Sequence, residues 1–186
     1  MDKNLKNADL INPNWEQHGY IQIYTGNGKG KTTASLGLAL RAVCAGYKVY
    51  MGQFMKGRDY SELMAPSLLP GFTLEQYGSP EFLTGEPTEK DYERAENGLK
   101  KIMEVISSGE YDVVIMDEIN TALHFNLLKT EDVLKILDAK PEKMELVLTG
   151  RYGKDEIIEK ADLVTEMKEI KHYYQKGVPS RRGIEN

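Results

Sequence analysis

The chain has 186 residues, of which 40% are hydrophobic and 28% charged, and its formal net charge is −5. This balance excludes a disordered chain, and the acidic charge excludes the basic footprint of a nucleic-acid binder. The polar start predicts no signal peptide and no run reaches the ~20 apolar residues that span a bilayer, so we expect a cytoplasmic protein without nucleic-acid or membrane partners.

Strand and helix patterns alternate along the chain. Residues 1–18 lack a sustained period and predict an N-terminal arm, followed by one domain over residues 19–186. Strands are predicted over 20–24, 48–54, 72–77, 111–116, 145–148 and 163–167, and helices over 32–45, 88–106, 121–128, 130–137 and 154–161. Leu36, Leu40, Val43 and Tyr47 share one face of the first helix, and Thr88 with Asp91 forms a capping box before the second.

This alternation predicts an α/β fold with a mostly parallel central sheet and helices on both faces. Ligands of such sheets bind beyond the carboxyl ends of the strands, so the chemistry is expected there.

A glycine-rich segment joins the first strand to the first helix. It reads Thr25-Gly26-Asn27-Gly28-Lys29-Gly30-Lys31-Thr32. The backbone N–H groups of such a loop surround phosphate oxygens at a helix N-terminus, while Lys31 reaches the phosphates and Thr32 offers a ligand to Mg²⁺. The strict phosphate-loop pattern has glycine where Thr25 stands. The flanking strand and helix favour phosphate binding over an incidental glycine-rich turn.

The fourth strand ends in two carboxylates, Asp117 and Glu118. A carboxylate at this place holds the Mg²⁺ of a bound nucleotide in phosphate-loop proteins. Either side chain could instead position a water for ATP hydrolysis. Which of the two contacts the metal is open at this point.

The remaining polar candidates give weaker signals. His18, His124 and His172 show no metal-ligand spacing; His124 is interpreted as a packing residue and His172 as part of a solvated end. Arg41 follows the phosphate loop on the first helix, where a surface salt bridge is the default. Arg151 follows the fifth strand on the ligand side and, with Lys56 and Arg58, could neutralise phosphates.

Taken in order, these segments resemble the ATP:corrinoid adenosyltransferases of the CobA/BtuR type, over residues from about Gly19 to Ile184. The resemblance is carried by residues 24–33 (YTGNGKGKTT), 53–57 (QFMKG), 116–118 (MDE) and 148–151 (LTGR), and by Lys171-His172, Gly177 and residues 183–185 (GIE). It implies a phosphate-loop NTPase fold of the RecA-like kind.

The resemblance also implies an activity, transfer of the 5′-deoxyadenosyl group of ATP to a reduced corrinoid with release of triphosphate. Lys31 and Glu118 would be catalytic, and Mg²⁺ would lie on Thr32, Asp117 and Glu118. The implied nucleotide-binding residues are Thr25, Gly26, Asn27, Gly28, Lys29, Gly30, Lys31, Thr32, Thr33, Arg41 and Arg151. Phe82 matches a loop aromatic that contacts the corrinoid, while the nearby Trp of some members is absent, since the single Trp is Trp15.

Further implied partners are a second copy of the chain, with the tail and arm helping to close the site, and an electron donor such as a reduced flavoprotein. Co(I) is itself a strong nucleophile, so the reaction needs no protein base; it needs a stabilised triphosphate and an aligned C5′. From the residues alone, an ATPase or small-molecule kinase and a non-catalytic ATP sensor stay open.

Overall fold

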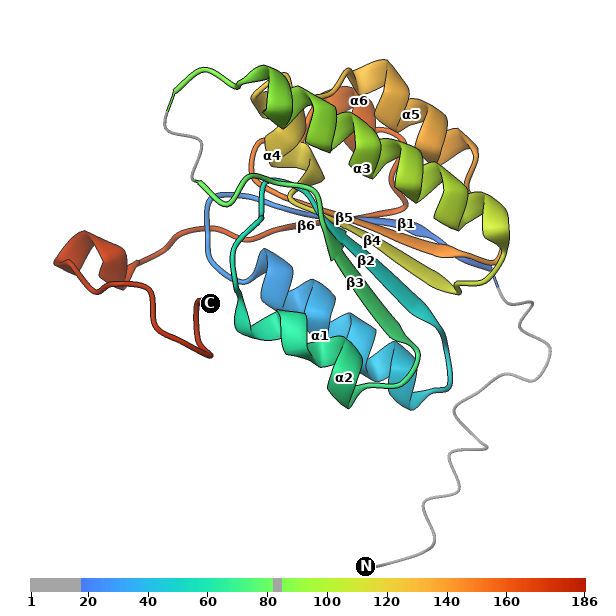
Figure 1. Cartoon of the computed structure of the whole chain (residues 1–186), viewed down its shortest axis with the longest axis horizontal. Helices are drawn as coiled ribbons and strands as arrows, with labels where there is room; N and C mark the ends of the chain where they lie inside the picture. The colour runs from blue at the N-terminus through green and yellow to red at the C-terminus, as the bar shows by residue number, and fades with distance from the viewer. Residues whose placement is uncertain (1–17, 82–84) are drawn as a thin grey trace, which may run out of the picture.

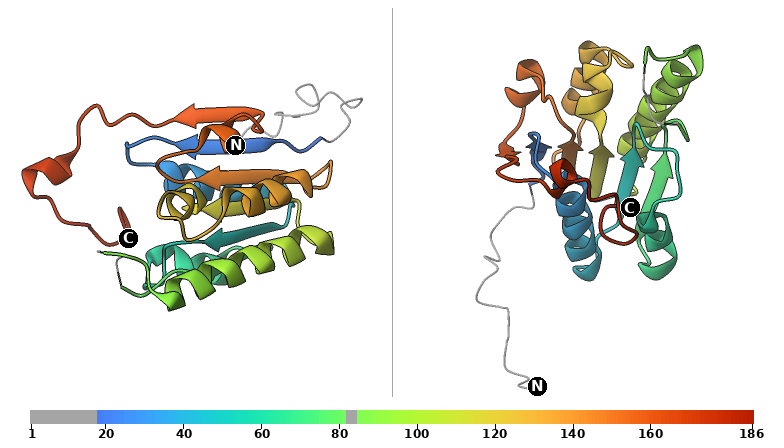
Figure 2. Two further views of the ribbon diagram at one scale, coloured as in Figure 1. Left: turned by 90° about the horizontal axis from the view of Figure 1, so that it is seen from above. Right: turned by 90° about the vertical axis from the view of Figure 1, so that its left-hand side faces the viewer.

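Six parallel strands form a single sheet in a computed structural model that describes residues 18–81 and 85–186 (Figure 1). The strand order is β3-β2-β4-β5-β1-β6. The strands are β1 (Ile21–Thr25), β2 (Val49–Gln53), β3 (Phe72–Gln76), β4 (Val113–Asp117), β5 (Glu145–Thr149) and β6 (Leu163–Glu166). Because all pairs are parallel, the carboxyl ends meet at one edge, to which every arrow points in the left panel of Figure 2.

Helices cover both faces of this sheet (Figure 1). One layer holds α3 (Glu89–Ser108), α4 (Ile119–His124), α5 (Thr130–Asp138) and α6 (Asp155–Ile158), and the other holds α1 (Lys31–Cys44) and α2 (Ala65–Leu68). Two short 3₁₀ helices, η2 (Ser61–Met64) and η3 (Tyr173–Lys176), complete the described elements. A hydrophobic cluster fills each interface between sheet and helices. The predicted α/β architecture is confirmed.

Local sequence signals account for most element boundaries. The capping box is present, since the Thr88 N–H donates to Asp91 Oδ2 at 2.9 Å. All five residues of β4 are buried, as expected for a strand covered on both faces. The helix predicted over 154–161 is wrong in length, because α6 is a single turn over Asp155–Ile158. The short helices η2 and α2 were not predicted from the sequence.

The face that α1 presents to the sheet differs from the apolar face in the sequence. The buried residues of α1 are Lys31, Ser35, Ala39 and Ala42. Of the predicted apolar face, Leu36 and Val43 are partly buried against the core, whereas Leu40 and Tyr47, the latter beyond the end of α1, are 46% and 39% exposed. Small side chains let the helix lie close to the strands, and the larger Leu36 and Val43 side chains pack beside this contact only partly buried. Of the helices in residues 18–81 and 85–186, none has the length and apolar character to cross a membrane.

Candidate nucleotide-binding site

The glycine-rich segment lies between β1 and α1 at the carboxyl edge of the sheet. Gly30 starts α1 with φ of 118°, a conformation that favours glycine. The first N–H groups of a helix have no intrahelical acceptor, so they are available to an anion. The Lys31 ammonium folds back over this segment and donates to the carbonyl oxygens of Gly26 and Gly28 at 2.8 and 2.7 Å. Burial lowers the pKa of Lys31, and the Glu118 carboxylate opposes this shift.

The chain that follows β6 supports the loop from behind. The Gly28 N–H donates to the Met167 carbonyl at 2.7 Å. A Cβ on Gly26 or Gly28 would lie 2.5 or 2.7 Å from that same carbonyl oxygen. The close approach of two backbones therefore requires glycine at both positions.

Asp117 is the most highly connected carboxylate of the site and is fully buried. Its Oδ1 accepts hydrogen bonds from Thr32 Oγ1 at 2.9 Å and from Thr149 Oγ1 at 2.7 Å. Its Oδ2 lies 2.9 Å from Lys56 Nζ and 3.3 Å from Gln53 Nε2. These contacts join the phosphate loop to the end of β4, so Thr32 and Asp117, the two residues predicted to hold Mg²⁺ together with Glu118, lie side by side.

Glu118 begins α4 in the left-handed conformation, with φ of 61°. Its N–H donates to Thr149 Oγ1 at 3.0 Å, and its Oε2 accepts from Thr121 Oγ1 at 2.5 Å. Burial and the neighbouring Asp117 raise the pKa of Glu118, while the Thr121 hydrogen bond opposes the shift. A backbone conformation that is costly outside glycine is typical of functional positions.

Lys56, interpreted from the sequence as one of three cations that could neutralise phosphates, lies between Thr32, Glu62 and Asp117. Its Nζ lies 3.3 Å from Thr32 Oγ1 and 3.4 Å from Glu62 Oε1, in addition to its ion pair with Asp117. Burial lowers the pKa of Lys56, but the Asp117 and Glu62 carboxylates outweigh it and the net shift is upward, so the ammonium is charged. The motif Gln-Phe-Met-Lys-Gly was the available signal; Glu62, on η2, had none.

The donor set fits Mg²⁺. This ion takes one or two protein carboxylates together with phosphate oxygens and water, and it accepts a hydroxyl ligand. Thr32 Oγ1 and Asp117 Oδ1 lie 2.9 Å apart beside Glu118, and a cation, the Lys56 ammonium, is already held against the same two residues.

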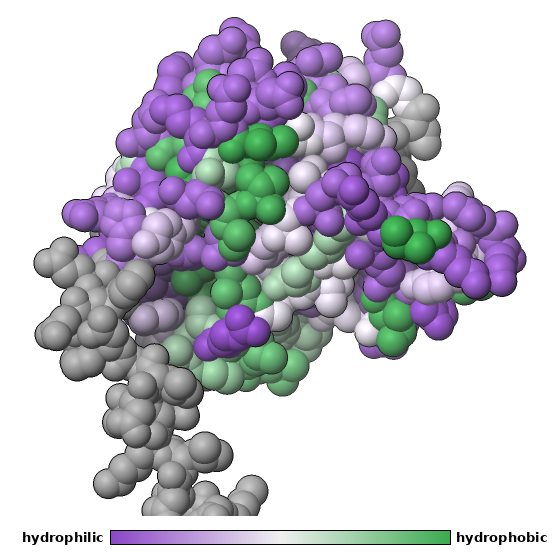
Figure 3. Space-filling model, turned by 180° about the vertical axis from the view of Figure 1, so that it is seen from behind, coloured by the Kyte–Doolittle hydropathy of each residue, from purple (hydrophilic) through white to green (hydrophobic). Residues whose placement is uncertain are grey.

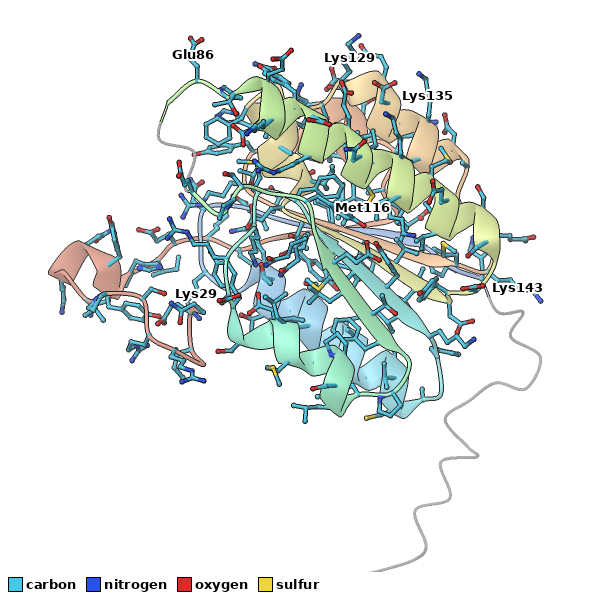
Figure 4. All side chains as sticks on the ribbon, viewed as in Figure 1. Lys29, Glu86, Met116, Lys129, Lys135 and Lys143 are labelled. Carbon is cyan, nitrogen blue, oxygen red and sulfur yellow. The ribbon has the colours of Figure 1, made fainter. Side chains whose placement is uncertain are left out.

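A cleft of about 500 Å³ opens above these groups. Lys29, Thr33, Glu118 and Arg151 line it, and the C-terminal tail contributes the other side. The tail residues in the lining are His172, Gly183, Ile184, Glu185 and Asn186. Figure 1 shows this tail crossing in front of the loop, and Figure 4 shows Lys29 on the same side of the molecule. Lys29 Nζ donates to the Ile184 carbonyl at 3.4 Å. His172 thus belongs to the cleft and not to a solvated end.

Other predicted site residues lie elsewhere. Thr25 anchors the loop, because its Oγ1 accepts the Gly153 N–H at 3.1 Å. Asn27 is exposed at the loop tip. Arg41 is not among the residues that line the cleft, and it lies ten positions after Lys31 on α1, about 15 Å along the helix. Phe82 lies outside the described residues. His124 is exposed and stacks on Tyr152 with ring centroids 3.9 Å apart, so the interpretation as a packing residue was incomplete.

A buried amide stands next to the carboxylates. Asn120 is fully buried in the first turn of α4, and within the part of the chain that the structure describes neither its nitrogen nor its oxygen has a hydrogen-bond partner. A Cβ on Gly150 would lie 3.0 Å from Asn120 Cβ, so glycine is required opposite it. An unsatisfied buried amide costs stability and is typical of a functional position.

A loop of this form, facing a buried carboxylate across a parallel sheet, defines a phosphate-loop nucleotide-binding protein. The fold resembles that of the flagellar accessory protein FlaH of Methanocaldococcus jannaschii, with a TM-score of 0.56 and 16% identity over 89% of this chain and 78% of that one. The family model for ATP:corrinoid adenosyltransferase BtuR/CobO/CobP matches residues 17–186, and the chain belongs to this family.

Curated relatives agree with the family match. A corrinoid adenosyltransferase of a Sinorhizobium species is 35% identical over 91% of this chain and 81% of its own length. The corrinoid adenosyltransferase of Escherichia coli K12 is 31% identical over 91% of this chain and 87% of its own length. The chain is a corrinoid adenosyltransferase, an enzyme that transfers the adenosyl group of ATP to a corrinoid.

Proposed function

We propose that the cleft between the phosphate loop and the tail binds ATP with Mg²⁺ and aligns its C5′ with the Co(I) of a corrinoid. Cobalt attacks C5′ and forms the Co–C bond, while the C5′–O bond breaks and its electron pair leaves with triphosphate. Support comes above all from one contact, the 2.9 Å hydrogen bond that joins Thr32 to Asp117. This hydrogen bond brings the phosphate loop next to the carboxylate at the end of β4.

The loop stabilises the departing triphosphate. Lys31 exchanges its bonds to the Gly26 and Gly28 carbonyls for phosphate oxygens, and the first N–H groups of α1 donate to the same group. Arg151, on the cleft wall, adds positive charge. Thr32, Asp117 and Glu118 would hold Mg²⁺, which supplies charge neutralisation of the triphosphate. The nucleophile is the corrinoid's own cobalt, so the mechanism assigns no general base to the protein.

The test is an anaerobic incubation of the protein with Mg-ATP and reduced cob(I)alamin, with the corrinoid spectrum and the phosphate products followed together. We expect a light-sensitive adenosylcobalamin spectrum and one triphosphate for each corrinoid converted. Lys31→Ala should lose this activity, while the matched control Lys143→Gln should keep it, since Figure 4 shows Lys143 at the far end of the molecule. Release of ADP or phosphate with an unchanged corrinoid would mean that the site hydrolyses ATP or serves a kinase.

Two partners follow from the same proposal. A reduced flavoprotein or similar electron donor generates Co(I), and two copies of the chain form a dimer. Leu40, Met64 and Leu68 are 46%, 61% and 73% exposed on α1, η2 and α2, and Figure 3 shows hydrophobic surface in the lower part of the molecule, where this layer lies. Sedimentation analysis of the wild type and of Leu40→Glu tests the dimer, which the variant should weaken if α1 contributes to the contact.

A further inference from the structure

The Lys56 ammonium lies where the phosphate loop meets the carboxylates. It contacts Asp117 Oδ2 at 2.9 Å, Thr32 Oγ1 at 3.3 Å and Glu62 Oε1 at 3.4 Å. The Lys56 and Glu62 side chains are 15% and 14% exposed, and the Asp117 side chain is fully buried. A buried carboxylate is stable only when it is paired, so Lys56 balances the charge of Asp117 in this structure.

The same ammonium also faces the cleft. Lys56 and Tyr60 both line it, and Lys56 Nζ lies 5.3 Å from the centre of the Tyr60 ring. A lysine head moves readily on its flexible four-carbon stem. The charge that balances Asp117 is therefore within reach of phosphates placed on the loop.

The groups around Lys56 keep partners when it moves. Gln53 Nε2 lies 3.1 Å from Glu62 Oε1 and 3.3 Å from Asp117 Oδ2, so one amide serves both carboxylates. Gln53 Oε1 is in turn held by Gln76 Nε2 at 3.0 Å. Asp117 also keeps its hydrogen bonds from Thr32 and Thr149. Departure of the ammonium thus removes a charge from this network but leaves its geometry in place.

We propose that Lys56 is a positioning residue and the built-in counter-cation of the metal site: it excludes a divalent cation until the nucleotide binds, and then moves to the nucleotide phosphates. This inference rests on the proposed Mg²⁺ site at Thr32, Asp117 and Glu118. Without nucleotide, a divalent ion and the ammonium repel each other at the one carboxylate. The triphosphate carries enough negative charge to bind both the divalent ion and the Lys56 ammonium, so the metal ion and the nucleotide bind together.

The test measures Mn²⁺ binding by the electron paramagnetic resonance signal of the free ion, on the full chain without corrinoid. Lys56→Gln is compared with the wild type and with the matched control Lys143→Gln, each with and without the non-hydrolysable analogue AMP-PNP. In Lys56→Gln we expect Mn²⁺ alone to bind at least tenfold tighter and AMP-PNP, in the presence of Mn²⁺, at least tenfold weaker. A purely structural role for Lys56 would weaken both, so an unchanged or weaker affinity for Mn²⁺ alone overturns the inference.

Further measurements distinguish a failure of this inference about Lys56 from a failure of the proposed Mg²⁺ site. If the wild type does not bind Mn²⁺ even with AMP-PNP, the proposed metal site fails and Lys56 loses its role with it. If the wild type binds both and Lys56→Gln behaves identically, the role of Lys56 alone is refuted. Should Lys56→Gln not fold, a crystal structure of the wild type with Mn²⁺ and AMP-PNP decides: we expect Lys56 Nζ on a phosphate oxygen, and a retained ion pair with Asp117 contradicts the inference.

Discussion

Thr149 is the residue whose replacement tests the architecture of the site most directly. Its Oγ1 donates to Asp117 Oδ1 at 2.7 Å and accepts the Glu118 N–H at 3.0 Å, and the side chain is fully buried. Thr149→Val keeps the shape of the side chain and removes both hydrogen bonds. Asp117 retains Thr32 and Lys56 as partners, but the Glu118 N–H is left without its acceptor.

The expected cost follows from these two bonds. A hydrogen bond to a charged group contributes about 1.5–3 kcal/mol, and a buried N–H without a partner costs about 1–3 kcal/mol. We therefore expect Thr149→Val to lower the free energy of unfolding by about 3 kcal/mol. At about 2–4 °C per kcal/mol for a domain of this size, the Tm should fall by roughly 6–12 °C.

Urea and thermal unfolding of the metal-free protein measure this loss, with Thr149→Ser as the matched control. Serine keeps the hydroxyl and loses one methyl group, a cost of about 1 kcal/mol. Adenosyl transfer should follow the same order, with Thr149→Ser retaining more activity than Thr149→Val. A loss below about 1 kcal/mol in Thr149→Val would refute the reasoning, because the hydroxyl would then contribute little to either carboxylate.

Three further predictions concern other parts of the molecule. Gly28→Ala places a Cβ 2.7 Å from the Met167 carbonyl oxygen and should weaken AMP-PNP binding at least tenfold, as measured by calorimetry. The control Gly37→Ala adds a Cβ in open space within α1 and should stabilise the protein by about 0.5–1 kcal/mol. Equal affinities of the two variants for AMP-PNP would contradict the prediction for Gly28. Asn120→Leu removes an unsatisfied buried amide and should raise the free energy of unfolding by about 1–3 kcal/mol while slowing adenosyl transfer; a loss of stability would show that the amide is satisfied in solution. Hydrogen bonding to Arg181 lowers the pKa of Glu185 to about 2, so the contribution of this pair to the tail is complete above pH 4.5 and is lost as the pH falls from there toward 2. NMR titration of the Glu185 carboxyl should show this value, with a return toward 4.5 in Arg181→Gln; an unchanged value would exclude Arg181 as the cause.

Hydrophobic periodicity, together with the glycine and turn-forming residues between the periodic segments, was sufficient to predict the layers of the fold. Every predicted strand is present within one or two residues, because each is a short apolar run followed by glycine, acid or turn residues. Sequence patterns did not predict features that depend on tertiary contacts, such as which face of a helix packs on the sheet and how long a short helix is. Helix α1 packs on the sheet through Ser35, Ala39 and Ala42, which leaves Leu40 exposed, and α6 ends after one turn.

The candidate site was predictable where the chemistry is local in sequence. Lys31, Thr32 and Asp117 belong to recognisable local motifs, and the structure places Thr32 within hydrogen-bond distance of Asp117, next to Lys31 in the loop. Contacts between segments that are distant in the sequence could not be predicted from a local motif. The burial of Lys56 depends on Glu62 and Asp117 meeting it from two other elements, and the role of Thr149 depends on the alignment of β5 with β4.

The position of β1 has a consequence for biosynthesis. This strand lies between β5 and β6, with Ile21 in register with Leu146 and Gln22 with Leu163. The ribosome therefore makes the phosphate loop before the strands that flank β1 and before the Met167 carbonyl that supports the loop. At about 5–20 residues per second, the loop waits on the order of ten seconds for these partners. A nascent chain that has not yet reached β6 thus carries the phosphate-loop motif without the neighbouring strand and carbonyl that support it.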